Sequence, residues 1–244
     1  MSRNFELLAQ IEDDLSTAQH DAQPQQESAI ESELERSPRP SYPGSDEILH
    51  MVRRVFLPVK GEGLHRVLFC GATEDLSSSI VCARVARTLA SQTYKKVCVI
   101  DGNLAWRRLS VLLGNGAFSG AQDTTAVADG RLQLEPNLYL LRSESLTAQG
   151  SSTLAGTELS SVFAQLEKEF DFIVIDGPSP TVSDDCILLG QLVEAAILVI
   201  EAGRTRRTVA AEAKGFLARA GVVVAGTVLH NHTLPVPEKL YRWL

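Results

Sequence analysis

Residues 66–90 read RVLFCGATEDLSSSIVCARVARTLA, and this stretch gives the strongest indication of the fold. Its first six residues form an apolar run typical of a buried strand, and a helical pattern at 78–91 follows a short polar loop. Helical patterns at 104–113, 157–169 and 205–219 alternate with further apolar runs, at 95–101, 137–141, 170–178, 195–202 and 222–230. Strands rich in Val, Ile and Leu between helices predict an α/β fold: a doubly wound, mostly parallel sheet flanked by helices.

The segment ahead of this pattern has a different composition. The chain has 244 residues and a net charge of −7, but residues 1–47 hold 3 basic and 11 acidic side chains, against 20 and 19 in 48–244. Residues 16–45 are rich in Gln, Ser, Glu and Pro, and such a composition buries too little apolar surface to offset chain entropy. We therefore expect a disordered acidic segment over 1–45 and a folded domain over 46–244, which begins with a helix at 46–56.

Within the acidic segment, four apolar residues recur at helical spacing: Phe5, Leu8, Ile11 and Leu15. This spacing fits either a frayed, solvated helix or a short amphipathic helix that docks onto a partner. The folded part is nearly neutral, so binding to nucleic acid through bulk charge is disfavoured, because that mode needs a basic surface.

The cysteine pattern and the charge near the N-terminus indicate a cytoplasmic protein. None of the four cysteines lies in a C-x-x-C pair, which is typical of a reducing compartment: Cys70, Cys82, Cys98 and Cys186. The first fifteen residues are interrupted by charges and predict no signal peptide. No apolar run is long enough to predict a membrane span.

The loop after the first strand has the register of a phosphate-binding loop, G-x-x-x-x-G-K-[ST]. Gly71 matches the first glycine and Ser78 matches the final hydroxyl, with Ser79 next to it. Leu76 stands in place of the second glycine, and Ser77 stands in place of the lysine. The motif is therefore only partly present.

Two later strands end in acidic residues, Asp101 and Asp176. Ligands of open parallel sheets bind outside the carboxyl ends of the strands, and a magnesium–phosphate site needs carboxylates there for its metal and its water. Ser78, Asp101 and Asp176 are therefore the candidate magnesium ligands, and Asp101 is the candidate catalytic residue. Either aspartate alone is more typical of a helix cap or a turn, and only their order in one chain indicates a site.

With these motifs, residues 46–244 resemble the cytoplasmic domain of bacterial tyrosine kinases of the CpsD/CapB type, relatives of the MinD/ParA ATPases. The resemblance rests on the loop at 71–79, on VCVIDGN at 97–103 and on FDFIVIDGPSP at 170–180. It implies a P-loop NTPase-like fold, ATP and magnesium as cofactors, and a nucleotide site that includes Gly71, Ser77, Ser78 and Ser79. His230 stands where the family has an asparagine that contacts adenine, and Tyr241 lies in a tail that resembles the family's tyrosine-bearing tail.

The departures from the family pattern predict weak ATP binding. Loss of the lysine removes a charge-assisted bond worth about 1.5–3 kcal/mol. A left-handed backbone at Leu76 would add about 1–2 kcal/mol, and Glu74 and Asp75 would each repel a phosphate by about 3 kcal/mol before solvation. The positive end of the helix dipole would stabilise a bound phosphate by only about 0.3–2 kcal/mol. The sequence therefore predicts no high-affinity cofactor unless an arginine compensates, and the candidates are Arg84, Arg107 and Arg108.

Three functions remain open from the sequence. The first is a degenerate tyrosine-kinase-like protein that regulates or scaffolds exopolysaccharide or capsule biosynthesis and export. Its partners would be a membrane polysaccharide co-polymerase or activator, which would hold it at the inner membrane, and further copies of itself or an active kinase. The second is an active ATP-dependent autokinase with a non-standard phosphate loop, and the third is a MinD/ParA-like positioning adaptor.

Overall fold

The computed structural model describes residues 45–114, 125–127, 130–147, 154 and 156–231. The expected disordered segment, except for its last residue, and the tail with Tyr241 lie outside these residues. Among the described helices, none is both long enough and apolar enough to cross a membrane.

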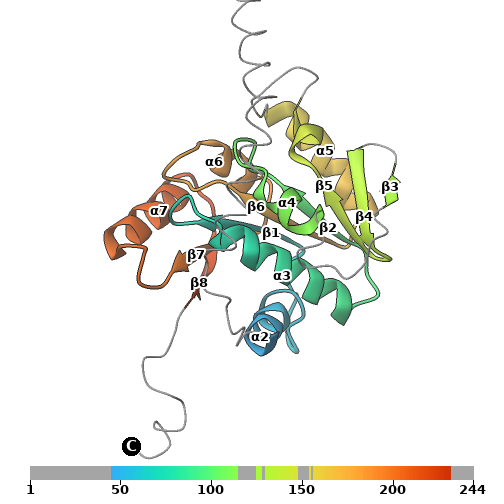
Figure 1. Ribbon diagram of the computed structural model, residues 1–244, viewed down its shortest axis with the longest axis horizontal. Helices are drawn as coiled ribbons and strands as arrows, with labels where there is room; N and C mark the ends of the chain where they lie inside the picture. Colours follow the sequence, from blue (N-terminus) through green and yellow to red (C-terminus); the bar gives the residue numbers. More distant parts are fainter. Residues whose placement is uncertain (1–44, 115–124, 128–129, 148–153, 155, 232–244) are drawn as a thin grey trace, which may run out of the picture. The chain divides into compact units, whose positions relative to one another are not determined.

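A single sheet forms the centre of the described part of the chain (Figure 1). Its eight strands lie in the order β3-β4-β5-β2-β6-β1-β7-β8, and all neighbours from β5 to β8 are parallel. The prediction of a mostly parallel sheet is confirmed. The strands are β1 (Arg66–Gly71), β2 (Val97–Asp101), β3 (Thr125–Val127), β4 (Arg131–Glu135), β5 (Leu138–Leu141), β6 (Phe172–Gly177), β7 (Ala195–Glu201) and β8 (Val224–His230).

Helices cover both faces of the sheet, as near-continuous apolar strands require. One apolar core lies between the sheet and α2 (Ser45–Val55), α3 (Ser77–Gln92) and α4 (Arg108–Gly114). The other core lies between the opposite face and α5 (Gly156–Glu169), α6 (Asp185–Gly190) and α7 (Arg207–Arg219). β1, β2 and β6 are almost wholly buried between these two layers.

Two differences from the sequence prediction have local causes. The helix expected at 104–113 begins only at Arg108, because Asn103 accepts a hydrogen bond from the Trp106 amide (3.2 Å) and Arg107 has a positive φ of 34°. These features form a turn before the helix. The antiparallel strands β3 and β4 were not predicted, because they are short and only the inner part of β4 is buried.

The strand order brings three loops to one edge of the sheet. β1 pairs with β6, and β6 pairs with β2, so the carboxyl ends of these strands are neighbours. Asp101 lies directly opposite Asp176 in the β2–β6 register, and the Gly102 amide donates to the Asp176 carbonyl (2.8 Å). The loop that follows β1 therefore lies at the same edge as both aspartates.

We expect Gly71→Ala to destabilise the fold at this edge. A Cβ on Gly71 would lie 2.4 Å from the Thr73 carbonyl oxygen, so the loop backbone would have to move. The expected loss is about 1–3 kcal/mol of unfolding free energy, measured by urea denaturation. The matched control is Gly226→Ala in β8, where an added Cβ meets nothing within 4 Å and a change within about 0.5 kcal/mol is expected. Equal losses in the two variants would contradict the prediction.

Candidate functional site

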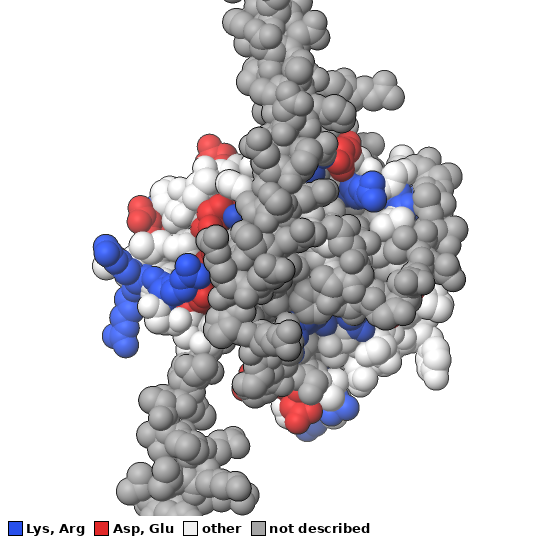
Figure 2. Space-filling view, in the orientation of Figure 1, with Lys and Arg blue, Asp and Glu red and all other residues white. Residues whose placement is uncertain are grey.

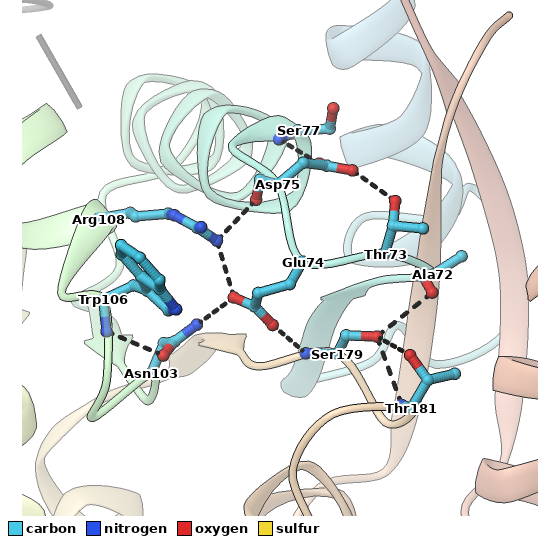
Figure 3. Close-up of polar contacts among 10 residues, drawn as sticks. All are labelled: Ala72, Thr73, Glu74, Asp75, Ser77, Asn103, Trp106, Arg108, Ser179 and Thr181. Carbon is cyan, nitrogen blue, oxygen red and sulfur yellow. Dashed lines mark hydrogen bonds and ion pairs between the residues drawn. The ribbon is translucent and has the colours of Figure 1, made fainter. Parts of the chain in front are cut away.

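The loop at 72–76, between β1 and α3, is held by its own acidic residues (Figure 3). The Glu74 carboxylate accepts three hydrogen bonds: from Asn103 Nδ2 (2.8 Å), from Arg108 Nη1 (2.7 Å) and from the Ser179 amide (2.9 Å). The first two donors follow β2 and the third follows β6. One carboxylate thus joins the three loops at the carboxyl edge of the sheet.

The second acidic residue of the loop binds the start of α3. Asp75 Oδ1 accepts from the Ser77 amide (2.8 Å), and its Oδ2 accepts from the Thr73 hydroxyl (2.6 Å). Arg108 Nη1 also donates to the Asp75 carbonyl (3.0 Å). An amide at the first turn of α3, a group that could face an anionic ligand, is therefore directed to a carboxylate of the chain itself.

Arg108 is the functional candidate that the sequence left unplaced. Its guanidinium lies over the Trp106 ring, 5.0 Å from the ring centroid, and its side chain is only 7% exposed. Arg107, the preceding residue, instead pairs with Glu144 (2.6 Å) at a more exposed position. Of these two adjacent arginines, Arg108 on the first turn of α4 binds the loop, and Arg107 binds Glu144.

The expected backbone strain at Leu76 is wrong. Leu76 has φ −77° and ψ −10°, a right-handed helical conformation that any residue adopts, and its side chain is buried. Ser77, Ser78 and Ser79 are also buried, on the first turn of α3. The loop therefore accommodates a leucine without a left-handed residue.

His230 ends β8, where it lies opposite Glu201 in the β7–β8 register. Burial lowers the pKa of His230 below its ordinary value of 6.5, Glu201 opposes this shift, and Arg84 adds to it. Asp75 raises this pKa by a smaller amount, which places His230 within the electrostatic field of the loop.

Asp101 and Asp176 are both buried, and they differ in their partners. Asp101 Oδ2 accepts from the Ser110 amide (2.8 Å) and hydroxyl (2.6 Å), whereas Oδ1 has no hydrogen-bond partner among the described residues. Neither carboxylate oxygen of Asp176 has such a partner within the described part of the chain. The Asp176 side chain therefore does not act as a cap or turn former, the role more typical of a single aspartate at a strand end.

The two aspartates have raised pKa values. Burial raises the pKa of Asp176 to about 8; the charge of Asp101 adds to the rise, and a nearby Ser79 hydroxyl offsets part of it. Burial likewise raises the pKa of Asp101 to about 6, against the bonds from Ser110. Two buried carboxylates in register disfavour each other's charge, so the pair favours a proton or a cation.

The aspartate pair is only a partial metal site. Ser78 lies on the first turn of α3 and the two aspartates end β2 and β6, so the candidate ligands share one edge of the sheet. No group of three or more His, Cys, Asp or Glu side chains that could hold a metal ion occurs in the described ranges. A cation here would therefore be held by Asp101 and Asp176, with hydroxyls or water as its other ligands.

Two known proteins named as tyrosine-protein kinases are similar in sequence to this chain. CapB of Staphylococcus aureus, a candidate tyrosine-protein kinase, is 28% identical over 173 residues, which cover 68% of this chain and 74% of CapB. The tyrosine-protein kinase CpsD of Streptococcus pneumoniae serotype 4 is 27% identical over 191 residues, which cover 74% of this chain and 82% of CpsD. The chain is a homologue of these CapB/CpsD tyrosine kinases. No family model matches the sequence.

Solved structures confirm the P-loop ATPase fold of this CapB/CpsD homologue. The chimerical protein CapA2B2 superposes with a TM-score of 0.60 at 15% identity, covering 80% of this chain and 87% of the chimera. The septum site-determining protein MinD of Pyrococcus horikoshii, complexed with Mg-ADP, gives a TM-score of 0.51 at 21% identity, covering 72% of this chain and 76% of MinD.

The loop of the CapB/CpsD homologue does not fit the phosphate groups that this fold implies. Ser77 occupies the lysine position, and the donors that face the loop bind the carboxylates of Glu74 and Asp75. A phosphate placed there would meet two carboxylates before it met a free cation. The unpartnered oxygens of Asp101 and Asp176 fit a cation, whereas the donors of Arg108, Ser179 and Ser77 are already bonded to carboxylates of the chain.

The raised pKa of Asp176 predicts a pH-dependent effect of Asp176→Asn. With a folded-state pKa near 8, above the ordinary value of 3.8, the native state binds more protons than the unfolded chain over this range. The stability drawn from this group is therefore fully present below about pH 4 and is lost as the pH rises through about 8. We expect the variant to gain stability relative to wild type from about pH 5 to about pH 8, by at most about 1.4 kcal/mol per pH unit.

Urea denaturation of both proteins across this pH range measures the difference. Asp184→Asn is the control, because Asp184 is exposed and makes no side-chain capping bond to α6. Parallel stability curves for wild type and Asp176→Asn would contradict the prediction.

Proposed function

We propose that this chain is a tyrosine-kinase-like P-loop protein that acts without ATP, as a regulatory or scaffolding component of exopolysaccharide or capsule biosynthesis and export. The proposal rests on the hydrogen bonds of the loop at 72–76, which stands in the place of a phosphate loop. Glu74 holds the buried Arg108, and Asp75 holds the first amide of α3. Ser77 in place of the lysine removes the cation that the motif supplies.

The positions of three lysines of the described residues support loss of catalysis. Lys95 and Lys96 precede β2, and Lys168 shares a hollow with His65 and Arg66. These residues lie at the amino-terminal edge of the strands, opposite the loop. To reach a phosphate bound at the start of α3, any of these three lysines would have to extend from the amino ends of the strands to their carboxyl ends.

The alternative is an active ATP-dependent autokinase with a non-standard phosphate loop. One observation favours it: Asp101 and Asp176 are buried side by side with unpartnered oxygens, a costly arrangement that a bound cation would relieve. If Arg108 is the arginine that replaces the missing lysine, Glu74 must first release it. The buried ion pair at 2.7 Å opposes that step.

The proposed partner is a membrane polysaccharide co-polymerase or activator, which would hold the protein at the inner membrane. The homology to CapB and CpsD supports the capsule context, and the name of the chimera CapA2B2 pairs a CapA part with a CapB part. Association with further copies of the chain or with an active kinase is part of the same proposal.

We expect partner binding to be independent of ATP. Calorimetric titration of the full-length chain with ATP and magnesium should show no binding below the millimolar range, because the loop offers carboxylates where a phosphate would bind. Co-purification with the cytoplasmic part of a CapA-like membrane activator should be equal with and without ATP. Asp101→Asn, a change at the candidate catalytic residue, should leave this binding unchanged.

Three results would contradict the proposal. Micromolar ATP affinity would restore the autokinase alternative, and phosphotyrosine formed on the chain after incubation with ATP and magnesium would do so directly. An activator that binds only when ATP is present would also contradict an ATP-independent role.

A further inference from the structure

We propose that Arg108, Asn103 and the Ser179 amide form an anion cradle for a phosphoryl group, and that Glu74 is the intramolecular ligand that occupies it. The inference deepens the proposed function, because it concerns the same loop. It rests on that proposal in one respect, namely that the wild-type protein binds phosphate weakly. It assigns a binding role to residues that the phosphate-loop motif does not include.

The geometry of the cradle is that of a site built around an oxyanion. Three donors from two loops converge on the two oxygens of one carboxylate, at 2.7, 2.8 and 2.9 Å (Figure 3). One donor is a guanidinium, one is an amide side chain and one is a backbone N–H. This combination of a cation with directed neutral donors is typical of phosphate and carboxylate recognition.

The donors are fixed independently of Glu74. The Asn103 side chain is held by the Trp106 amide (3.2 Å), and Arg108 lies over the Trp106 ring. The Ser179 hydroxyl donates to the Ala72 carbonyl (3.3 Å) and contacts the Thr181 hydroxyl (2.9 Å). Removal of the Glu74 carboxylate would therefore leave the three donors in place around an empty position.

Burial explains why the empty cradle would take up an anion. Arg108 and Asn103 are each about nine-tenths buried or more, at 6% and 5% exposure, and Ser179 is 1% exposed. A buried guanidinium without its counter-charge is costly, so an external oxyanion that replaces the carboxylate regains charge-assisted bonds. The Glu74 side chain, at 18% exposure, is the most accessible member, which gives a ligand a route to its position.

The cradle fits a phosphoryl group better than a second carboxylate. The Asp75 carbonyl takes a further bond from Arg108, and the loop continues directly into α3, which begins at Ser77. Inorganic phosphate has four oxygens, one for each of the three donors and one that can face the positive end of α3, whereas a carboxylate has only two. Glu74 competes with it at the high effective concentration of a tethered group, so wild type should bind phosphate weakly.

The test compares the thermal unfolding of full-length wild type and Glu74→Ala in inorganic phosphate, with sodium chloride at equal ionic strength as reference. The melting temperature of Glu74→Ala should rise saturably, by several degrees, at phosphate concentrations at least about tenfold lower than wild type requires. Glu74→Gln, which keeps the size of the side chain and loses its charge, should respond in the same direction; it provides the readout if Glu74→Ala does not fold.

Two controls separate the cradle from general salt effects. Glu144→Ala breaks the exposed ion pair of the adjacent Arg107 and should respond to phosphate as wild type does. Glu74→Ala combined with Arg108→Met should lose the response, because the cation of the cradle is gone. Equal phosphate responses in Glu74→Ala and Glu144→Ala, or a response that survives in the double variant, would overturn the inference.

Further titrations distinguish the source of the phosphoryl group. A response of Glu74→Ala to inorganic phosphate alone assigns the cradle to free phosphate, and a response to magnesium-free ATP as well assigns it to the terminal group of a nucleotide. Micromolar ATP binding by wild type would overturn the proposed ATP-independent function. The phosphate responses of wild type and Glu74→Ala would then still decide whether the cradle binds an anion. Absence of a phosphate response in both Glu74 variants, with no ATP binding by wild type, would overturn the cradle alone.

Discussion

The ion pair between Glu74 and Arg108 connects the parts of this protein that a ligand would otherwise connect. It joins the loop after β1 to the first turn of α4, and the second oxygen of Glu74 extends the connection to the loop after β6. The chain thus joins these three loops through one of its own carboxylates. Because both partners are largely buried, removal of either one leaves an uncompensated buried charge.

The same edge of the sheet contains a second, unbalanced electrostatic feature. Asp101 and Asp176 face each other in register, and three of their four carboxylate oxygens have no hydrogen-bond partner among the described residues. The two groups of carboxylates at this edge therefore differ. Those of the loop at 72–76, Glu74 and Asp75, have hydrogen-bond partners within the chain, whereas most carboxylate oxygens at the two strand ends do not.

The proposed function uses the kinase-like fold as a binding scaffold. Sequence similarity to CapB and CpsD extends over about two thirds to three quarters of the chain, while the likeness to MinD establishes only the fold. A fold of this kind does not by itself imply catalysis, because function depends on the residues at the site. Here those residues include a buried arginine that is already paired and no lysine at the motif position.

The sequence by itself determined the elements and their class, because periodicity and apolar runs are local properties of the chain. It correctly placed β1, α3, β2 and β6 and the two strand-terminal aspartates. Only the tertiary structure decided that Glu74 meets Arg108, 34 positions later, and Ser179, 105 positions later, since strand order brings these loops together. It also decided that Leu76 is unstrained and that Asp176 is unpartnered, because backbone angles and buried contacts depend on how the elements pack.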